Sequence, residues 1–398
     1  MKNVRRVAVA CIGDPRDWKT WSGAPRHLID ALGQQGIDIV GIDTGVASKW
    51  RKVANFAGYH FGRQDFHNLI SVDRIGAQIS LLNSEARSDY NFSKAAREGR
   101  ALRLQQELCN ADTNHLLHMT SLSLAPSVKP SAHLNNYVYC DTTWNIIASK
   151  HPIERFSQST RRELEYLEAA AFDQVDHFFT MAEYVRQDLI DHYKIEPNRV
   201  TAVGTGRGKL LPFQGNKNYS NSYILFTAKL RFEEKGGRLL LDAFGLAHAR
   251  NSKLKLVIVG QESYVQRLRG IPGVTARGHI AWNELQELFD GAALFAMPSL
   301  CEPWGLVYLE ALASRTPVLG LNCNSLPEIT QNGKFGFLVD DASPAAIAET
   351  LAKALDNPEA LRIMGEAGQR HCLETYSWQR VASNMIEAMF PGARTREG

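Results

Sequence analysis

The chain has 398 residues, of which 44% are hydrophobic and 22% are charged, a length and composition typical of a globular protein of two or three domains. Its 45 Lys and Arg residues against 42 Asp and Glu residues give a formal charge of +3, which offers no reason to expect nucleic-acid binding driven by phosphate neutralisation. The six cysteines are scattered without Cys-x-x-Cys spacing, a pattern that favours buried reduced thiols over a zinc or redox site.

The N-terminal residues predict a strand rather than a leader peptide. Their apolar part runs only from Val7 to Ile12 and is broken by Gly13 and Asp14. The chain contains no run of eighteen apolar residues, so no transmembrane helix is predicted. We therefore expect a cytoplasmic protein.

The first half of the chain begins with a strand, a helix and a second strand. These are predicted at Arg5–Gly13, Ala24–Leu32 and Ile37–Asp43. Two further strands, His115–Ser121 and Asn135–Thr143, each end in polar residues, where a parallel sheet places its ligands. This order predicts a parallel sheet covered by helices.

A polar region between residues 50 and 112 ends in a predicted amphipathic helix at Phe92–Leu108. Four basic residues of this helix follow i, i+3 spacing and would form one stripe: Lys94, Arg97, Arg100 and Arg103. A solvated face is the favoured interpretation of the stripe. Contact with an anionic membrane surface is the alternative.

The end of the first half contains three alternating glycines within Asn198–Gly208. They suggest a dinucleotide fingerprint but fail it, because Leu211 and Pro212 follow where a helix would be needed. The polar, glycine-containing stretch Pro212–Ser222 predicts an interdomain linker. A strand, charged loop and helix at Tyr223–Ala247 then start a second half.

The most informative stretch is a predicted strand–helix–strand unit in this second half. A strand at Ala292–Met297 precedes a helix that Pro303 opens, and Pro317 ends the helix before a strand at Val318–Leu321. Glu302 is expected at the helix start, and Glu310 lies about 12 Å farther along the same helix at about 1.5 Å per residue. That separation suits the two ends of a sugar nucleotide.

The residues Glu302, Pro303, Trp304, Gly305, Leu306 and Glu310 resemble the Glu-x7-Glu signature of retaining glycosyltransferases, especially family 4, the glycosyl transferases group 1. The resemblance implies an α/β protein with the GT-B fold, in which two Rossmann-like domains face an interdomain cleft. Residues 1–208 would form the acceptor domain, with a C-terminal helix at about 378–398 packing back on it. Residues 209–377 would form the nucleotide-sugar donor domain.

The same resemblance implies that all six of these motif residues contact the donor. Glu302 would hold the sugar hydroxyls, the amides of Gly305 and Leu306 would meet the diphosphate, and Glu310 would take the ribose hydroxyls. Physical chemistry agrees on the diphosphate, because exposed amides at a helix N-terminus, backed by the positive end of the helix dipole, bind anions.

Further donor residues are expected from the resemblance in three other loops. Lys229 and Lys235, the latter followed by Gly236, would clamp the distal phosphate. Gly278, His279 and Ile280 would border the nucleobase. Gly23 would approach the donor phosphates, although a helix cap formed by Ser22, with Gly23 in the turn, accounts for these residues equally well.

The reacting face departs from the family pattern. Members commonly present a histidine and an acidic residue after the strand at Asn135–Thr143, whereas this chain has Cys140 and Asp141. Asp141 alone would keep the polar role, and Cys140 has no activating base that would make it a nucleophile. His118 is a candidate substitute, but a structural role is favoured for it. The aromatic and basic residues of the first loop would border the acceptor groove: Trp18, Lys19, Trp21 and Arg26.

The implied reaction is transfer of a hexose-type sugar from a nucleotide-diphosphate donor to an acceptor hydroxyl with retention of configuration. The donor is a co-substrate and no other cofactor is expected. The chain lacks an Asp-x-Asp motif, so no metal is expected. The acceptor would be a saccharide, a lipid-linked molecule or another small molecule. Two alternatives stay open: a non-catalytic sugar-nucleotide-binding subunit, and an epimerase or hydrolase on the same fold.

Overall fold

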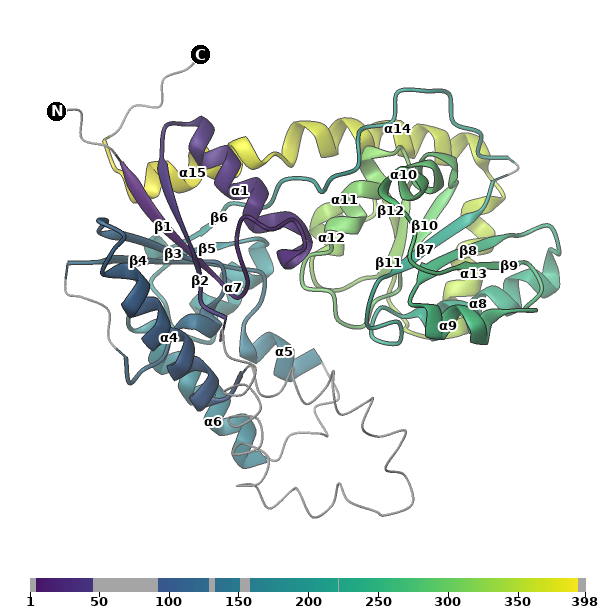
Figure 1. The fold of residues 1–398 in the computed structure, drawn as a ribbon. Helices are drawn as coiled ribbons and strands as arrows, with labels where there is room; N and C mark the ends of the chain where they lie inside the picture. Colours follow the sequence, from purple (N-terminus) through teal and green to yellow (C-terminus); the bar gives the residue numbers. More distant parts are fainter. Residues whose placement is uncertain (1–4, 46–91, 129–132, 151–157, 221, 393–398) are drawn as a thin grey trace. The chain divides into compact units, whose positions relative to one another are not determined.

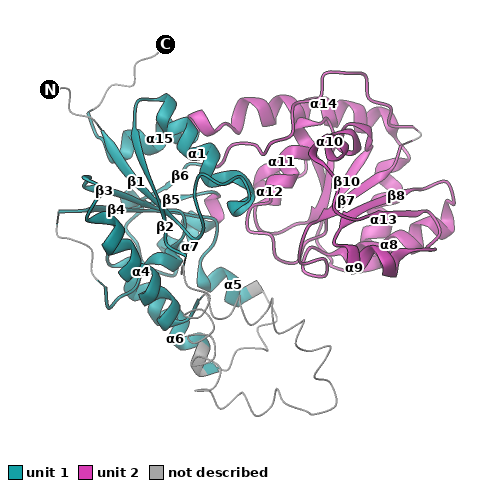
Figure 2. Ribbon diagram, viewed as in Figure 1, with its two compact units in different colours: residues 1–181, 185–203, 381–398 teal, residues 182–184, 204–380 magenta. Residues whose placement is uncertain are grey.

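The computed structural model describes residues 5–45, 92–128, 133–150, 158–220 and 222–392 (Figure 1). The chain divides into two compact units, coloured separately in Figure 2. Unit 1 comprises Met1–Met181, Val185–Val203 and Val381–Gly398, and unit 2 comprises Ala182–Tyr184 and Gly204–Arg380.

The described part of unit 1 contains a six-stranded parallel sheet in the order β2-β1-β3-β4-β5-β6. Its strands are β1 (Arg6–Cys11), β2 (Asp38–Asp43), β3 (His115–His118), β4 (Asn135–Cys140), β5 (His177–Thr180) and β6 (Val200–Ala202). Its α-helices are α1 (Ala24–Gln34), α4 (Lys94–Leu108), α5 (Trp144–Lys150), α6 (Gln158–Phe172), α7 (Glu183–Asp191) and α15 (Trp378–Met389), with short 3-10 helices η1 (Thr20–Gly23), η4 (Ser121–Ser123) and η6 (Pro197–Arg199). The first residues of α7 and α15 belong to unit 2.

Helices cover both faces of this sheet. Ala8 and Ala10 of β1 pack with Leu104 of α4, and α1 and α15 lie on the other face from α4 and α6 (Figure 1). Because side chains alternate along a strand, Val7 and Val9 face the side opposite to Ala8 and Ala10, and all four are fully buried. A strand buried on both faces explains the continuous apolar run that predicted it.

Unit 2 also has a six-stranded parallel sheet in its described residues, in the order β12-β11-β10-β7-β8-β9. Its strands are β7 (Ile224–Ala228), β8 (Leu256–Gly260), β9 (Val274–Arg277), β10 (Leu294–Ala296), β11 (Val318–Leu321) and β12 (Gly336–Val339). Its helices are α8 (Gly237–Arg250), α9 (Glu262–Leu268), α10 (Trp282–Gly291), α11 (Leu306–Ala313), α12 (Leu326–Ile329), α13 (Pro344–Leu355) and α14 (Pro358–Thr375). Two parallel sheets covered by helices are thus confirmed.

The predicted solvated face of α4 was wrong for the centre of the basic stripe, where Arg97 and Arg100 are buried, although Lys94 at its start is exposed. Arg97 and Arg100 are 1% and 3% exposed. Arg97 donates to the carbonyl of Ser121 at 3.0 Å and Arg100 donates to the carbonyl of Leu122 at 2.7 Å. The two guanidinium groups satisfy backbone acceptors inside unit 1 and cannot reach a membrane surface, so the stripe no longer supports a membrane contact.

The expected linker, residues 212–222, is fastened to unit 2 over most of its described length. The amide of Phe213 donates to the carbonyl of Ala313 at 3.0 Å. The Lys217 ammonium donates to the carbonyls of Phe289 and Ser314 at 2.9 and 2.6 Å. Burial lowers the pKa of Lys217 to about 7, the mark of an ammonium group withdrawn from water. Its polar composition therefore reflects hydrogen bonding to the unit rather than a free connection.

Within the described residues, none of the helices is both long and apolar enough to cross a lipid bilayer.

Candidate functional site

The sheet of unit 2 has a topological switch point beside β7. From β7 the chain continues to β8 and β9 on one side, whereas β10, β11 and β12 lie on the other. Ligands of open parallel sheets bind beyond the carboxyl ends of the strands at such a point. Lys229 directly follows β7 and is exposed, and the loop that carries Glu302 follows β10.

Lys235 and Glu302 form an ion pair at this edge, as expected of two residues of one site. The Lys235 Nζ lies 2.8 Å from Glu302 Oε2, and the two side chains are 25% and 18% exposed. A pair that is mostly shielded from water keeps more of its Coulomb attraction than a surface pair does. The structure thus brings together a cation predicted for the donor phosphate and a carboxylate predicted for the sugar.

The loops that carry this pair are locked by a close backbone approach at Gly236. Gly236 has a φ of 77°, and a Cβ there would lie 2.0 Å from the carbonyl oxygen of Pro298. The amide of Leu300 also donates to the carbonyl of Glu234 at 3.0 Å. Only glycine satisfies both the left-handed conformation and the close contact. The glycine after Lys235 therefore holds the lysine loop against the glutamate loop.

The helix of the motif begins later than Pro303 predicts. Gly305 is the N-cap of α11 with a φ of 82°, and the first helical residue is Leu306. Pro303 and Glu302 consequently lie in the loop before the helix rather than in its first turn. The correction places the amides of Gly305 and Leu306 at the helix start, where backbone N–H groups lack helical acceptors.

Pro303 and Trp304 anchor this loop through their backbone carbonyls. The Tyr184 hydroxyl donates to the carbonyl of Pro303 at 2.7 Å, and the Ser325 hydroxyl donates to the carbonyl of Trp304 at 2.5 Å. The Trp304 ring is 3% exposed and packs edge-on against Tyr376, with 5.8 Å between ring centroids. Trp304 was expected to contact the donor, but its buried ring leaves only its backbone for that purpose.

Glu310 lies on α11 and is held by the segment that enters unit 2. The Lys209 amide hydrogen bonds to the Glu310 carboxylate. Although the side chain retains some exposed surface, burial raises its pKa from 4.5 to about 7, against the opposing effects of this hydrogen bond and of Lys235. Sequence reasoning missed Lys209, whose neighbours Gly206 and Gly208 were noticed only as a failed fingerprint.

This raised pKa predicts a stability that falls as pH rises. Between about pH 4.5 and 7 the folded protein holds a proton on Glu310 that the unfolded chain releases, so each increase in pH in that window favours unfolding. Glu310→Gln should therefore stabilise the protein by about 3 kcal/mol at pH 8 and have little effect at pH 4.5. Chemical denaturation at both pH values checks this. The exposed Glu287→Gln is the control, and an equal effect of Glu310→Gln at both values would contradict the prediction.

The predicted nucleobase loop follows the edge strand β9. Gly278 packs against Glu262 of α9, since a Cβ at Gly278 would lie 2.2 Å from Glu262 Oε2. His279 is exposed, whereas Gly278 and Ile280 are partly buried. Glu262, the first residue of α9, was not singled out from the sequence.

The sheet of unit 1 has a switch point of its own, between β1 and β3. Gly23 is the N-cap of α1 with a φ of 83°, so Ser22 does not cap that helix. Asp141 follows β4 and is partly exposed. Asp43, at the end of β2, was missed; its carboxylate accepts hydrogen bonds from the amides of Gly13 and Gly45 at 2.9 and 2.7 Å.

Cys140 and His118 have the chemistry of core residues. Burial, followed by the charge of Asp141, raises the pKa of the Cys140 thiol well above its usual value, so it is no nucleophile. His118 is 1% exposed, and its ring nitrogens hydrogen bond to Ser123 at 2.7 Å and Asn136 at 2.8 Å. Burial lowers the pKa of His118 to about 4, which keeps the ring neutral. The structural role favoured for His118 is confirmed.

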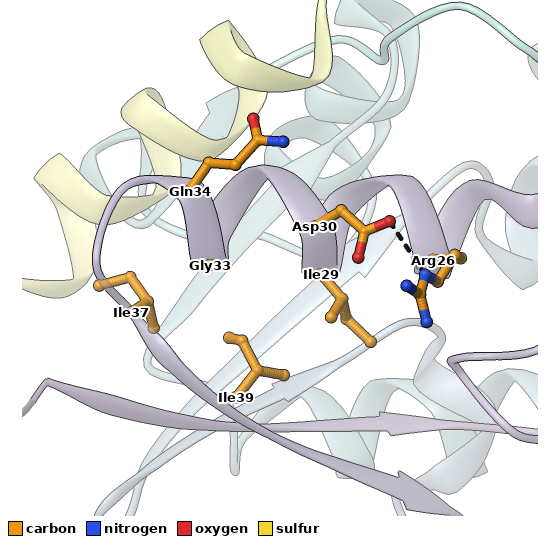
Figure 3. A pocket seen from close by; sticks show the side chains of 7 residues that line it. All are labelled: Arg26, Ile29, Asp30, Gly33, Gln34, Ile37 and Ile39. Atoms are coloured by element: carbon orange, nitrogen blue, oxygen red, sulfur yellow. Dashed lines mark hydrogen bonds and ion pairs between the residues drawn. The ribbon is translucent and has the colours of Figure 1, made fainter.

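An open groove of about 460 Å³ lies between α1 and β2 (Figure 3). Arg26, Ile29, Asp30, Gly33, Gln34, Ile37 and Ile39 line it. Arg26 is paired with Asp30 at 2.9 Å, and its guanidinium group lies 5.7 Å from the Trp18 ring centroid. Of the four residues expected to border the acceptor groove, only Arg26 lines this one. In the described ranges, no cluster of three or more His, Cys, Asp or Glu residues is arranged to hold a metal ion.

Comparison with known proteins shows which proteins this chain resembles. Residues 209–371 match the family model described as glycosyl transferases group 1. D-inositol 3-phosphate glycosyltransferase of Corynebacterium glutamicum is 29% identical over 238 residues, which are 54% of this chain and 56% of the relative. MMP alpha-(1->4)-mannosyltransferase of Mycolicibacterium hassiacum is 28% identical over 220 residues, 54% of this chain and 53% of the relative. The chain thus spans about half the length of these curated relatives.

Solved structures match almost the whole chain. WaaG, a glycosyltransferase involved in lipopolysaccharide biosynthesis, superposes with a TM-score of 0.64 at 14% identity over 97% of this chain and 100% of its own. Sucrose-phosphate synthase from Thermosynechococcus elongatus superposes with a TM-score of 0.69 at 16% identity, over 97% of this chain and 98% of its own. HepE of Anabaena, solved in complex with UDP and glucose, superposes with a TM-score of 0.62 at 14% identity, over 97% of this chain and 99% of its own. These matches confirm the predicted GT-B fold, and residues 209–371 are similar to the glycosyl transferases group 1.

Proposed function

We propose that this protein is a retaining glycosyltransferase of family 4 that transfers a sugar from a nucleotide-diphosphate-sugar donor to an acceptor hydroxyl. The observation that carries the proposal is the Lys235–Glu302 pair at the switch point of the unit 2 sheet, directly before the N-terminus of α11. This arrangement supplies a cation, a carboxylate and free backbone amides along one loop. A sugar diphosphate needs these three kinds of group.

The main chemical task in such a transfer is to stabilise the departing diphosphate. Lys229, Lys235 and the amides of Gly305 and Leu306 would do so by direct attraction, so we propose a reaction without a metal ion. Glu302 would hold the sugar hydroxyls and Glu310 the ribose hydroxyls. The departing phosphate would accept the proton of the acceptor on the same face of the sugar, so retention needs no protein nucleophile, and the protonated thiol of Cys140 is compatible with this.

The solved and curated proteins that this chain resembles support a nucleotide-sugar donor. HepE was solved with UDP and glucose, and the curated relatives are named for transfer to inositol phosphate or for mannosyl transfer. For this chain we propose a saccharide, a lipid-linked molecule or another small molecule as acceptor, near Asp141 in unit 1. Synthesis of a polysaccharide, glycolipid or glycoconjugate is the corresponding biological role.

Binding of nucleotides tests the donor site directly. One of UDP, GDP and ADP, or its sugar conjugate, should raise the melting temperature in the presence of EDTA, since a ligand at 100 times its Kd stabilises by about 2.7 kcal/mol. Lys235→Ala should abolish that shift and the exposed Glu287→Gln should preserve it. The absence of a shift with every nucleotide would exclude the donor site.

Product analysis separates the proposed transferase from its two alternatives. Consumption of the donor without any acceptor would identify a hydrolase or an epimerase. Donor binding without transfer across a broad panel of acceptors would favour a non-catalytic sugar-nucleotide-binding subunit, an alternative motivated by Cys140 in place of the usual histidine. The anomeric configuration of the product, read by NMR, decides between retention and inversion.

A further inference from the structure

The backbone at Gly208 and Lys209 lies directly against the carboxylate of Glu310. A Cβ on Gly208 would lie 2.1 Å from Glu310 Oε1 and 2.9 Å from its Cδ, distances that real Cβ atoms do not show. The next amide in the chain, that of Lys209, hydrogen bonds to the same carboxylate. Two consecutive residues thus fix where the carboxylate lies, one by its missing side chain and the other by its N–H group.

The backbone conformation of Gly208 does not itself require glycine. Gly204 of the same segment has a positive φ angle of 73°, whereas the φ angle of Gly208 does not lie in the left-handed region. A residue other than glycine could therefore adopt the conformation at position 208 without strain. The close contact with Glu310 is what the missing side chain permits.

The segment around Gly208 is anchored on both sides within unit 2. The Trp378 indole donates to the carbonyl of Arg207 at 2.8 Å. On the other side, the amide of Leu211 donates to the side chain of Gln286 at 2.8 Å, and the Gln286 amide donates back to the carbonyl of Leu211 at 3.1 Å. A side chain added at Gly208 would consequently displace the flexible end of Glu310 rather than the anchored backbone.

We propose that Gly208 and the Lys209 amide position the Glu310 carboxylate so that its remaining lone pairs accept the hydroxyls of a ribose, and thereby make the site selective for ribonucleotides over 2′-deoxyribonucleotides. This inference rests on the proposed function. A carboxylate offers about four acceptor positions. The Lys209 amide occupies one of them and sets the rotation of the group, which leaves positions for two neighbouring hydroxyls. Gly208 is a positioning residue, since it acts through Glu310.

Gly208→Ala tests the inference, because the clash involves the end of a flexible side chain and the protein should still fold. Titration calorimetry at pH 8, above the raised pKa of about 7 of Glu310, would compare UDP, GDP and ADP with their 2′-deoxy forms. We expect the wild type to bind the preferred ribonucleotide about tenfold more tightly than its deoxy form, the contribution of one hydrogen bond to a charged group. Gly208→Ala should remove most of that preference, and should weaken binding of the deoxy form only by the loss of the bond from its remaining 3′-hydroxyl. Gly245→Ala on α8, where an added Cβ meets nothing within 4 Å, is the control.

A double-mutant cycle distinguishes positioning from general damage. In a Glu310→Ala background the carboxylate is absent, so adding Gly208→Ala should change ribonucleotide affinity less than twofold. A further loss in that background would overturn the inference, as would a ribose preference that survives in Gly208→Ala. If the wild type binds no nucleotide at all, the proposed function fails as well. Nucleotide binding with an intact ribose preference in the variant overturns the inference alone.

Discussion

Glu302→Gln is expected to lower the rate of sugar transfer by roughly 10²- to 10⁴-fold, because two charge-assisted hydrogen bonds of about 1.5–3 kcal/mol each would be lost. Glutamine has nearly the size of glutamate but no charge, so the Lys235 ammonium loses the partner that lies 2.8 Å away. It also replaces one acceptor oxygen by an N–H₂ donor, which cannot accept from a sugar hydroxyl. Initial-rate measurements with the donor identified by thermal shift check this prediction.

Two comparisons make the Glu302 experiment specific. Glu287→Gln makes the same chemical change at an exposed position of α10 and should leave the rate within twofold of the wild type. Affinity for the nucleotide diphosphate without its sugar should change little in Glu302→Gln, because this glutamate is proposed to contact the sugar. A transfer rate within tenfold of the wild type would show that Glu302 does not hold the reacting sugar.

The donor motif could be predicted from the sequence because its signals are local. The apolar run after Pro317 predicted a strand at Val318–Leu321, and β11 has those bounds. The strand before the helix is shorter than predicted, with β10 at Leu294–Ala296 instead of Ala292–Met297. The helix start was also misplaced, since proline is common in a first helical turn and Pro303 was taken as its marker. The left-handed conformation of Gly305 delays the start of α11 to Leu306, and a glycine in the sequence does not by itself reveal the φ angle that it adopts.

The contacts around the motif could not be predicted, because they join residues that are remote in the chain. The Gly208–Glu310 contact depends on how the entering segment packs over α11, and no spacing in the sequence encodes it. The buried arginines of α4 show the same difficulty. Helical periodicity reveals that Arg97 and Arg100 share a face, but whether that face meets water depends on acceptors in another segment, the carbonyls of Ser121 and Leu122.

Glu168→Ala is expected to destabilise unit 1 by about 3–5 kcal/mol, the usual cost of removing one partner from a buried charge pair. Glu168 is 3% exposed and lies 3.9 Å from the guanidinium group of Arg97, which is 1% exposed. Its carboxylate also accepts hydrogen bonds from the Ser121 hydroxyl at 2.9 Å, the Trp144 amide at 2.5 Å and the Tyr193 hydroxyl at 2.7 Å. Truncation would leave a buried cation and three donors without this acceptor.

Chemical denaturation should measure this loss of stability. Hydrogen exchange should then show faster exchange in the helices that Glu168 joins, which are α4, α5 and α6. Lys94→Ala on α4 is the matched control, since Lys94 is 61% exposed and its ion pair with Glu98 spans 4.0 Å; it should cost less than about 0.5 kcal/mol. Replacing Arg97 and Glu168 together by Met and Leu should destabilise less than Glu168→Ala alone, because no buried charge then lacks its partner. A decrease of less than about 1 kcal/mol in the free energy of unfolding of Glu168→Ala would mean that water or backbone carbonyls already stabilise the Arg97 charge. The position of the loop at Asp141 to Trp144, and with it the proposed acceptor side, would then not depend on this network.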